Sequence, residues 1–339
     1  MKYSSTLLKR YITVDDTIEN IAQNLTLKSC EIEEIITRTI PSQVVIARVT
    51  HLEQHPQADK LNVATLDCGE KGTFQIICGG TNLAQDMYVA AALPGTHLPA
   101  ITMDIAEREM RGVLSQGMIC AKEELGIAED TEHHWIWDLS QDLEVHETHI
   151  GKSLQEIFPR LENSIIDVDN KTLTNRPDLT GHWGMATELQ AIYTQPTTTG
   201  NIKFNTIENY RKDIVHVNIL ETIQQSPKGS KNITVETPGC RSYISADIPN
   251  ITIQPSSFYT RLQLLDLGQE SKNNWIDFAH MFMVTSGQPI HFFDADKVQG
   301  DITVRNAQDG EEFTDLTNKN HILTTNDIVV CDAEKILAL

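Results

Sequence analysis

Four apolar runs decide the fold of this chain: Val44–Val49 (VVIARV), Leu61–Leu66 (LNVATL), Phe74–Ile77 (FQII) and Met87–Ala92 (MYVAAA). Each run is short and rich in strand-forming residues, and Gly, Pro and Asp separate one run from the next. Several short strands at such spacing are typical of a small barrel. The sequence therefore predicts a β-barrel of the OB type within residues 41–150.

The sequence on both sides of the barrel mixes helix and strand signals. Asp16 followed by Glu19 is similar to a capping box, which predicts that a helix begins there. A second helix is predicted from Thr180, and a third from a cap at Ser256 to its end at Gly268. We therefore expect an α+β multidomain protein, in which an OB-fold barrel is inserted into a small α/β domain and a mixed α+β domain follows.

The composition is that of a soluble globular protein, with 40% hydrophobic residues, 22% charged residues and a mean hydropathy of -0.27. The length of 339 residues predicts two or three domains. No apolar stretch approaches the roughly 18 residues that span a bilayer, and a secretion signal is not expected at the N-terminus. We therefore expect a cytoplasmic protein with no membrane partner.

The charge balance restricts how this chain could bind nucleic acid. The net charge of -20, from 27 Lys and Arg against 47 Asp and Glu, argues against a broad basic face. Binding to DNA is not expected, and any RNA site must be local or shared with a partner. The six cysteines are scattered without a Cys-x-x-Cys pair, which favours buried thiols in a reducing compartment and no metal site.

Three motifs lie in the barrel region: His55–Leu61 (HPQADKL), Ile77–Leu83 (ICGGTNL) and Met110–Cys120 (MRGVLSQGMIC). In this order they resemble the tRNA-binding OB module of phenylalanyl-tRNA synthetase β subunits, methionyl-tRNA synthetase tails and related RNA chaperones. The resemblance implies contact with tRNA phosphates, which needs cations. The candidate cations are Arg48, Lys60, Arg108, Arg111 and Lys122. Residues 40–150 hold 6 Lys and Arg against 17 Asp and Glu, so these cations would have to cluster. The alternative is a barrel that serves in packing or docking.

A second region indicates which family member the chain resembles. Asp167–Leu179 (DVDNKTLTNRPDL) precedes Gly181–Leu189 (GHWGMATEL), and together they resemble a stretch of the bacterial-type phenylalanyl-tRNA synthetase β subunit. Arg176 and Asp178 suit a rigid loop with an internal ion pair. The aspartates of this loop could instead supply a magnesium site. Order at a subunit interface is the favoured interpretation.

A third region resembles the editing domain of the same β subunit, through Asn273–Ala279 (NNWIDFA) and Gly287–Asp296 (GQPIHFFDAD). In the family this domain hydrolyses tyrosine wrongly attached to phenylalanine tRNA. The resemblance implies that His291 is the catalytic residue, which orients water or the terminal adenosine. The implied pocket neighbours are Asn274, Asp277, Ala279, His280 and Gln288.

The chain departs from the family pattern in this third region. Glu270 stands where the family has an arginine near the tRNA end, which reverses the charge that faces a phosphate. Ala279 and His280 stand where a Thr-Asn pair lines the amino-acid pocket. The chain ends at Ile336–Leu339, inside an expected buried strand, which favours a truncated editing domain.

These observations predict three domains: residues 1–40 with 151–200, the OB module at 41–150, and an editing domain at 201–339 that is truncated at its C-terminal end. The resemblance implies the β subunit of phenylalanine–tRNA ligase, which binds tRNA(Phe), assembles with an α subunit as (αβ)2, and hydrolyses mischarged tyrosyl-tRNA(Phe) if its pocket is completed. ATP and Mg2+ are used by the α subunit, so no cofactor is expected on this chain. The alternatives are a non-enzymatic tRNA-binding or docking protein and a free-standing hydrolase that edits in trans.

Overall fold

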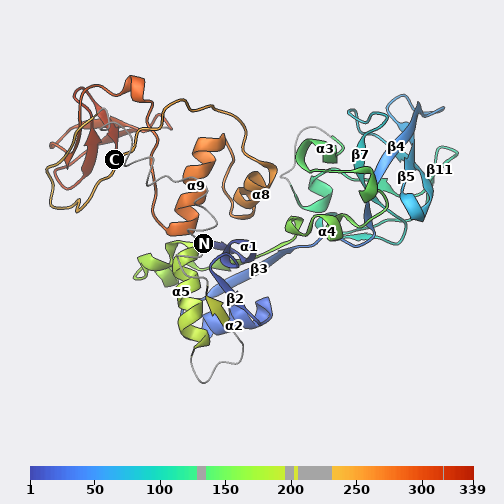
Figure 1. The fold of residues 1–339 in the computed structure, drawn as a ribbon, viewed down its shortest axis with the longest axis horizontal. Coiled ribbons are helices and arrows are strands. Elements are labelled where there is room, and N and C mark those ends of the chain that lie inside the picture. The colour runs from blue at the N-terminus through green and yellow to red at the C-terminus, as the bar shows by residue number, and fades with distance from the viewer. Residues whose placement is uncertain (128–134, 195–201, 205–230, 316) are drawn as a thin grey trace. The chain divides into compact units, whose positions relative to one another are not determined.

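The computed structural model describes residues 1–127, 135–194, 202–204, 231–315 and 317–339. The chain divides into two compact units. The first unit comprises Met1–Thr206 and Gln254–Ile290, and the second comprises Ile207–Ile253 and His291–Leu339. Figure 1 shows the order of the elements along the chain.

An antiparallel five-stranded sheet forms the barrel region of the first unit (Figure 1). Its strands, in spatial order, are β12 (Met118–Ile119), β7 (Tyr88–Ala92), β4 (Val44–Gln54), β5 (Asn62–Asp67) and β6 (Thr73–Cys78). The amide of Gln116 donates to the carbonyl of Gln75 at 2.7 Å, so the chain just before β12 meets β6 at the other edge of the sheet. All four predicted apolar runs are strands, and the predicted OB-like, barrel-like sheet is confirmed.

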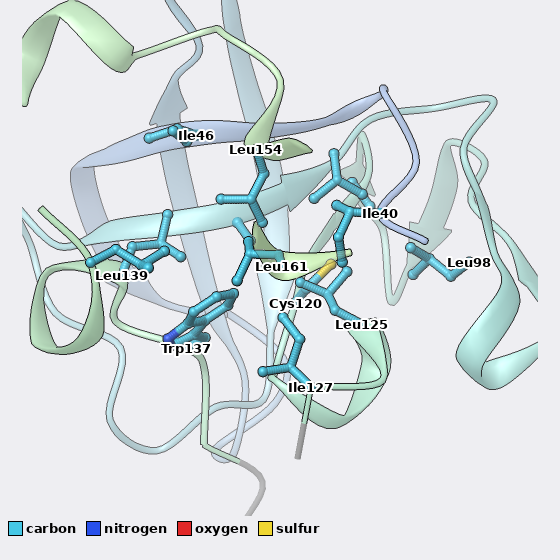
Figure 2. Packing of buried hydrophobic residues seen from close by; sticks show 14 of the residues in the cluster. Ile40, Ile46, Leu98, Cys120, Leu125, Ile127, Trp137, Leu139, Leu154 and Leu161 are labelled. Carbon is cyan, nitrogen blue, oxygen red and sulfur yellow. The ribbon is translucent and has the colours of Figure 1, made fainter. Parts of the chain in front are cut away.

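The first half of strand β4 is buried on both of its faces, which explains why Val44–Val49 is apolar with little alternation. Val45, Ala47 and Val49 face a core made with Leu66 and other residues of the sheet. Val44 and Ile46 belong to a second core on the opposite face, since successive side chains on a strand point to opposite sides. Figure 2 shows this second core, which the sheet shares with residues from the segments that cover it: Trp137, Leu139, Leu154 and Leu161.

Short elements complete the barrel region. These are β8 (His97–Leu98), β9 (Met103–Asp104), β10 (Arg108–Met110), β11 (Val113–Ser115), α3 (Leu139–Asp142) and α4 (Leu154–Ile157). Strands β8 and β9 pair with each other, as do β10 and β11. The β10–β11 hairpin contains the start of the third barrel motif.

A small three-stranded sheet has the order β1 (Lys2–Ser4), β13 (Asn163–Val168) and β3 (Ile32–Arg38), and all of its pairs are antiparallel. Strands from before and after the barrel therefore pair in one sheet. The helices beside it are α1 (Ser5–Leu8), α2 (Ile18–Lys28) and α5 (His182–Tyr193), and β2 (Ile12–Val14) pairs with β14 (Ile202–Phe204). The domain boundaries given above stay a prediction, and the expected linker at 195–200 lies outside the described residues.

Three helix starts differ from the prediction by one or two residues. The cap of α2 is Thr17, whose side chain accepts from the amide of Asn20, whereas Asp16 was the predicted cap. Helix α5 begins after Gly181 rather than at Thr180. The cap of the later helix is Ser257 rather than Ser256. In each case a neighbouring residue of similar capping ability takes the position, which sequence spacing alone does not resolve.

Helices α8 (Phe258–Asp266) and α9 (Asn274–Ser286) also belong to the first unit. Phe258 and Leu262 of α8 join the core that covers the barrel sheet. At the other end of α8, the carboxylate of Asp266 pairs with the guanidinium of Arg38 on β3. Helix α8 therefore connects the barrel region to the small sheet.

The second unit contains a four-stranded sheet and a hairpin. The sheet order is β15 (Ile233–Val235), β16 (Ile302–Asn306), β19 (Ile328–Cys331) and β20 (Ile336–Ala338), and only β15 and β16 pair in parallel. The hairpin is β17 (Glu312–Thr314) with β18 (Asn320–Ile322). The second unit has a small core, which is formed by Ala307, Leu323, Val329 and Cys331. Among the described residues, no helix is long and apolar enough to cross a membrane.

Candidate nucleic-acid interface

The structure divides the five predicted tRNA-binding cations into two groups. Arg48 and Lys122 are engaged by carboxylates, and Lys60, Arg108 and Arg111 lie on the turn and hairpin at one part of the barrel. The guanidinium of Arg48 lies 2.6 Å from a carboxylate oxygen of Asp86 and 3.3 Å from one of Glu147. The hydrogen bond that Arg48 donates to Asp86 raises the pKa of Arg48. The charge of Arg48 is therefore largely balanced within the barrel.

Lys122 contributes to packing beneath α8. Its ammonium lies 2.5 Å from a carboxylate oxygen of Asp142, whose side chain is 8% exposed. The same carboxylate accepts from the indole of Trp137 at 3.0 Å and from Arg261 of α8 at 2.7 Å. The ammonium also lies 5.4 Å from the ring centre of Phe258, within the range of a cation–π interaction. This network holds α8 on the barrel, so it gives Lys122 a structural role.

The other three cations come from two segments that the structure joins. Lys60 lies in the turn that follows β4, and Arg108 and Arg111 lie in the β10–β11 hairpin. Arg111 donates from its guanidinium to the carbonyl of Gln57 at 2.8 Å. This contact brings the first and the third barrel motifs, which are far apart in sequence, to one place.

His55 is buried and contacts both of these segments. The sequence did not predict a role for this residue in the site. Its side chain is 3% exposed. Nδ1 accepts from the amide of Gln57 at 3.1 Å, and Nε2 lies 3.1 Å from the carbonyl oxygen of Met110 and donates to it. Its presence in the HPQADKL motif was the only available signal, because burial and remote partners are not visible in a sequence.

Carboxylates restrict this basic surface. Asp59 adjoins Lys60, and Glu107 and Glu109 flank Arg108 in the chain. Glu107 accepts from the side-chain amide of Gln116 at 3.2 Å. Carboxylates thus lie beside the cations of the joined turn and hairpin in the chain, which suits contact with a few phosphates rather than with a long stretch of backbone.

The loop with the predicted ion pair has the expected contact and one more. Arg176 donates to Asp178 at 2.8 Å and to Glu188 of α5 at 2.7 Å. Hydrogen bonds from Arg176 lower the pKa of Asp178 and that of Glu188. No group of His, Cys, Asp or Glu suited to a metal ion is found in the part of the chain that the structure describes, and this includes Asp167, Asp169 and Asp178.

His182 of the GHWG motif is buried at the junction of α5, β1 and α9. Its Nε2 accepts from the amide of Ser4 at 2.8 Å, and its Nδ1 donates to the carbonyl of Val284 at 2.6 Å. Burial lowers the pKa of His182 to about 4. This histidine therefore remains neutral near neutral pH and joins segments that are about a hundred residues apart or more.

Two glycines of the same motif permit close backbone approach. A Cβ on Gly181 would lie 2.3 Å from the amide nitrogen of Gly287, and one on Gly184 would lie 1.7 Å from the carbonyl oxygen of Asp178. Neither space can hold a methyl group, so glycine is required at both positions. The second and third sequence motifs meet here and fix α5 against the end of α9.

Two of the predicted editing residues, Asn274 and Asp277, have contacts at the start of α9. Asp277 is fully buried and accepts from the hydroxyl of Ser271 at 2.6 Å and the amide of Lys272 at 2.8 Å. Burial alone would raise the pKa of Asp277, but hydrogen bonds from Ser256, Ser271 and Lys272 lower it. Asn274 exchanges hydrogen bonds with the backbone of Gln254 at 2.8 and 3.2 Å.

The remaining pocket candidates are spread over both units. Ala279 and His280 are half-buried on α9, and among the described residues Nδ1 of His280 is buried without a hydrogen-bond partner. Gln288 is exposed in the first unit, whereas His291 is exposed in the second unit and stacks on Phe293 with ring centres 6.4 Å apart. Their roles in editing stay a prediction.

Comparison with known proteins agrees with the sequence resemblance. The family model described as "Putative tRNA binding domain" matches residues 44–147, and the B3/4 domain model matches residues 239–339. The phenylalanine–tRNA ligase β subunit of Clostridium acetobutylicum is 31% identical over 341 residues, and the match covers 100% of this chain. That of Staphylococcus aureus (strain bovine RF122 / ET3-1) is 31% identical over 350 residues with the same coverage. The chain spans 40% of the length of these relatives.

One solved structure, the C-terminal domain of Plasmodium vivax p43, matches 23% of this chain and 46% of its own chain at 22% identity. The TM-score of 0.19 is too low to support a statement about a shared fold.

Proposed function

We propose that this chain, which is similar along its whole length to phenylalanine–tRNA ligase β subunits, supplies tRNA binding and subunit assembly to such a ligase. The observation that carries this proposal is the match along the whole chain, which includes a tRNA-binding domain model and a B3/4 domain model in the expected order. The joined turn and hairpin at Lys60 and Arg111 support tRNA as the ligand.

The partner in this proposal is a ligase α subunit in an (αβ)2 assembly in the cytoplasm. The α subunit would carry the ATP and Mg2+ sites and perform aminoacylation, so this chain needs no cofactor of its own. The rigid junction formed by His182, Gly181 and the Arg176 ion pairs suits a docking surface, because its backbone is fixed by contacts from several elements.

Co-expression with the α subunit of the same organism tests this proposal. We expect the two chains to purify together and the complex to retain tRNA(Phe) in a gel-shift assay. A folded chain that recovers neither the α subunit nor tRNA would contradict it. A chain that binds tRNA but not the α subunit would support the alternative, a non-enzymatic tRNA-binding or docking protein.

Editing is a second candidate function, favoured by the B3/4 domain match at residues 239–339. In this proposal His291 orients water near the ester of mischarged tyrosyl-tRNA(Phe). The test is deacylation of tyrosyl-tRNA(Phe) by the purified chain, alone and in complex with the α subunit. Loss of activity in His291→Ala with retained tRNA binding is expected, and hydrolysis no faster than without protein would contradict the proposal. Activity of the chain alone would support the alternative of trans editing.

A further inference from the structure

The β10–β11 hairpin reverses direction through an unusual pair of residues. Met110 pairs with Val113, so Arg111 and Gly112 form the two-residue loop, and their φ values are 51° and 78°. Positive φ at both positions is typical of a type I′ turn, which favours Asn-Gly or Asp-Gly. Arginine is uncommon in the left-handed region. A residue held there against its preference points to a use for its side chain.

The side chain and backbone of this turn are both fixed to the turn that follows β4. Arg111 donates from its guanidinium to the carbonyl of Gln57, and His55 donates to the carbonyl of Met110. His55 also accepts from the amide of Gln57, so the contacts form a closed ring. The ring is anchored by a side chain that is 3% exposed. The position of the hairpin tip is therefore set by a buried group.

The turn and the hairpin that these contacts join also carry exposed cationic side chains. The guanidinium of Arg111 has five N–H groups, and its hydrogen bond to Gln57 is the only hydrogen bond or ion pair it forms with the described residues. Lys60 and Arg108 form no ion pair within the described parts of the chain, unlike Arg48 and Lys122. Met110 and Leu114 of the same hairpin are 39% and 44% exposed. The joined turn and hairpin thus present cationic and apolar side chains to solvent.

We infer that the hairpin tip at Arg111, together with Lys60 and Arg108, contacts the phosphate backbone of RNA, and that His55 is the positioning residue of this surface. Arginine suits this task because its planar fork matches phosphate oxygens. The flanking carboxylates of Asp59 and Glu109 confine the contact to a few phosphates. The inference rests on the proposed tRNA-binding function and specifies which part of the barrel performs it.

Arg111→Asn separates this role from a structural one, because asparagine is preferred in a type I′ turn. We expect the variant to keep or raise the melting temperature of the chain while tRNA affinity falls by roughly 5- to 30-fold, and the salt slope of binding falls by about one. Thr102→Asn is the control for the turn, since Thr102 is exposed with a φ of 50° outside this surface. Lys71→Gln is the control for loss of one exposed cation. Both controls should retain wild-type affinity.

The positioning role of His55 is tested by a pair of substitutions. His55→Phe fills the space but removes both hydrogen bonds, and His55→Gln keeps a donor and an acceptor. We expect the first to weaken tRNA binding with the salt slope reduced, and the second to restore a large part of the affinity. If both variants bind as wild type does, His55 has no positioning role.

The outcomes distinguish this inference from the proposed function. If wild-type protein binds tRNA and Arg111→Asn binds equally well with the same salt slope, the inference is wrong while the proposed function stands. If folded wild-type protein in complex with the α subunit shows no affinity for tRNA, the proposed function is wrong as well. A loss of affinity equal in Lys71→Gln and Arg111→Asn would indicate a diffuse charge effect and would overturn the inference.

Discussion

His182 donates a hydrogen bond from Nδ1 to the carbonyl oxygen of Val284, 2.6 Å away, and so ties the first turn of α5 to the last turns of α9. The other ring nitrogen accepts from the amide of Ser4 on β1. Three segments from the start, middle and later part of the chain therefore depend on one neutral imidazole. This junction connects the GHWG segment of α5 with α9, the helix that contains most of the NNWIDFA segment.

Acid should destabilise the first unit through His182. Its pKa in the folded chain is about 4, below the ordinary value of 6.5, because burial disfavours the charged ring. The unfolded chain therefore binds more protons between these values, and stability falls as the pH drops from about 6.5 towards 4, by up to roughly 3 kcal/mol. In denaturant unfolding, the free energy of unfolding of His182→Gln should fall less over this pH range than that of the wild type. The exposed His146→Gln serves as control, and an unchanged pH slope in His182→Gln would contradict the prediction.

Removal of the Asp266 carboxylate should weaken the attachment of α8. Its side chain is 5% exposed and pairs with Arg38, which is 10% exposed, and it also accepts from Asn163 at 2.7 Å. Asp266→Ala leaves a buried guanidinium without its partner, which costs on the order of 3–5 kcal/mol. Thermal unfolding should report this loss. In the exposed Glu270–Lys272 pair, Glu270→Ala should cost only about 0–1 kcal/mol. A similar loss of stability in the two variants would contradict the role of the Asp266–Arg38 pair in attaching α8.

Glycine should be obligatory at position 184. A Cβ there would lie 1.7 Å from the carbonyl oxygen of Asp178, which is backbone and cannot swing away. Gly184→Ala is expected to destabilise the chain by more than about 3 kcal/mol, as a severe steric conflict in a packed region. In Gly79→Ala the new methyl group would lie 3.5 Å from a side-chain carbon of Leu61, an ordinary contact. The soluble yield and melting temperature of Gly79→Ala should therefore stay near those of wild type, and equal tolerance at both positions would contradict this interpretation.

Loss of Lys122 should affect folding more than RNA binding. Lys122 and Arg261 both bind the buried carboxylate of Asp142. Lys122→Met removes one of two cations from this site and should lower stability by about 1–3 kcal/mol. Affinity for tRNA, measured well below the melting temperature, should change little. A stable Lys122→Met variant with much weaker tRNA binding would contradict this expectation and support the predicted tRNA contact of Lys122.

Local patterns predicted the barrel well, and remote contacts explain the rest. The apolar runs in β4, β5, β6 and β7 were recognisable because each contains several buried apolar residues in succession. The ion pair of Arg176 with Asp178 was also predictable, since the two residues are near in sequence. The partners of Arg48 and Lys122 were not, because Asp86, Glu147 and Asp142 reach them only through the tertiary fold. A cation that the sequence suggests is available for RNA can thus form ion pairs within the protein instead.

The predicted editing residues on α9 also have contacts that the sequence does not reveal. Asn274 and Asp277 were expected in a pocket, and both have contacts that anchor the start of α9. A sequence pattern cannot separate a residue that binds substrate from one that holds the helix carrying the site. His55 illustrates the reverse case, since a histidine in a turn motif proves to be buried and central to the candidate surface.

The central claim is that this chain contacts tRNA through the barrel, and the most direct measurement is the dissociation constant of tRNA(Phe) at salt concentrations from about 50 to 200 mM. The chain in complex with its α subunit should be compared with the same complex carrying Lys60→Gln and Arg111→Asn. We predict that affinity of the wild-type complex falls steadily with salt, and that the double variant binds more weakly with a salt slope smaller by about two. Identical affinities and slopes for the two complexes would contradict a tRNA contact at this barrel surface.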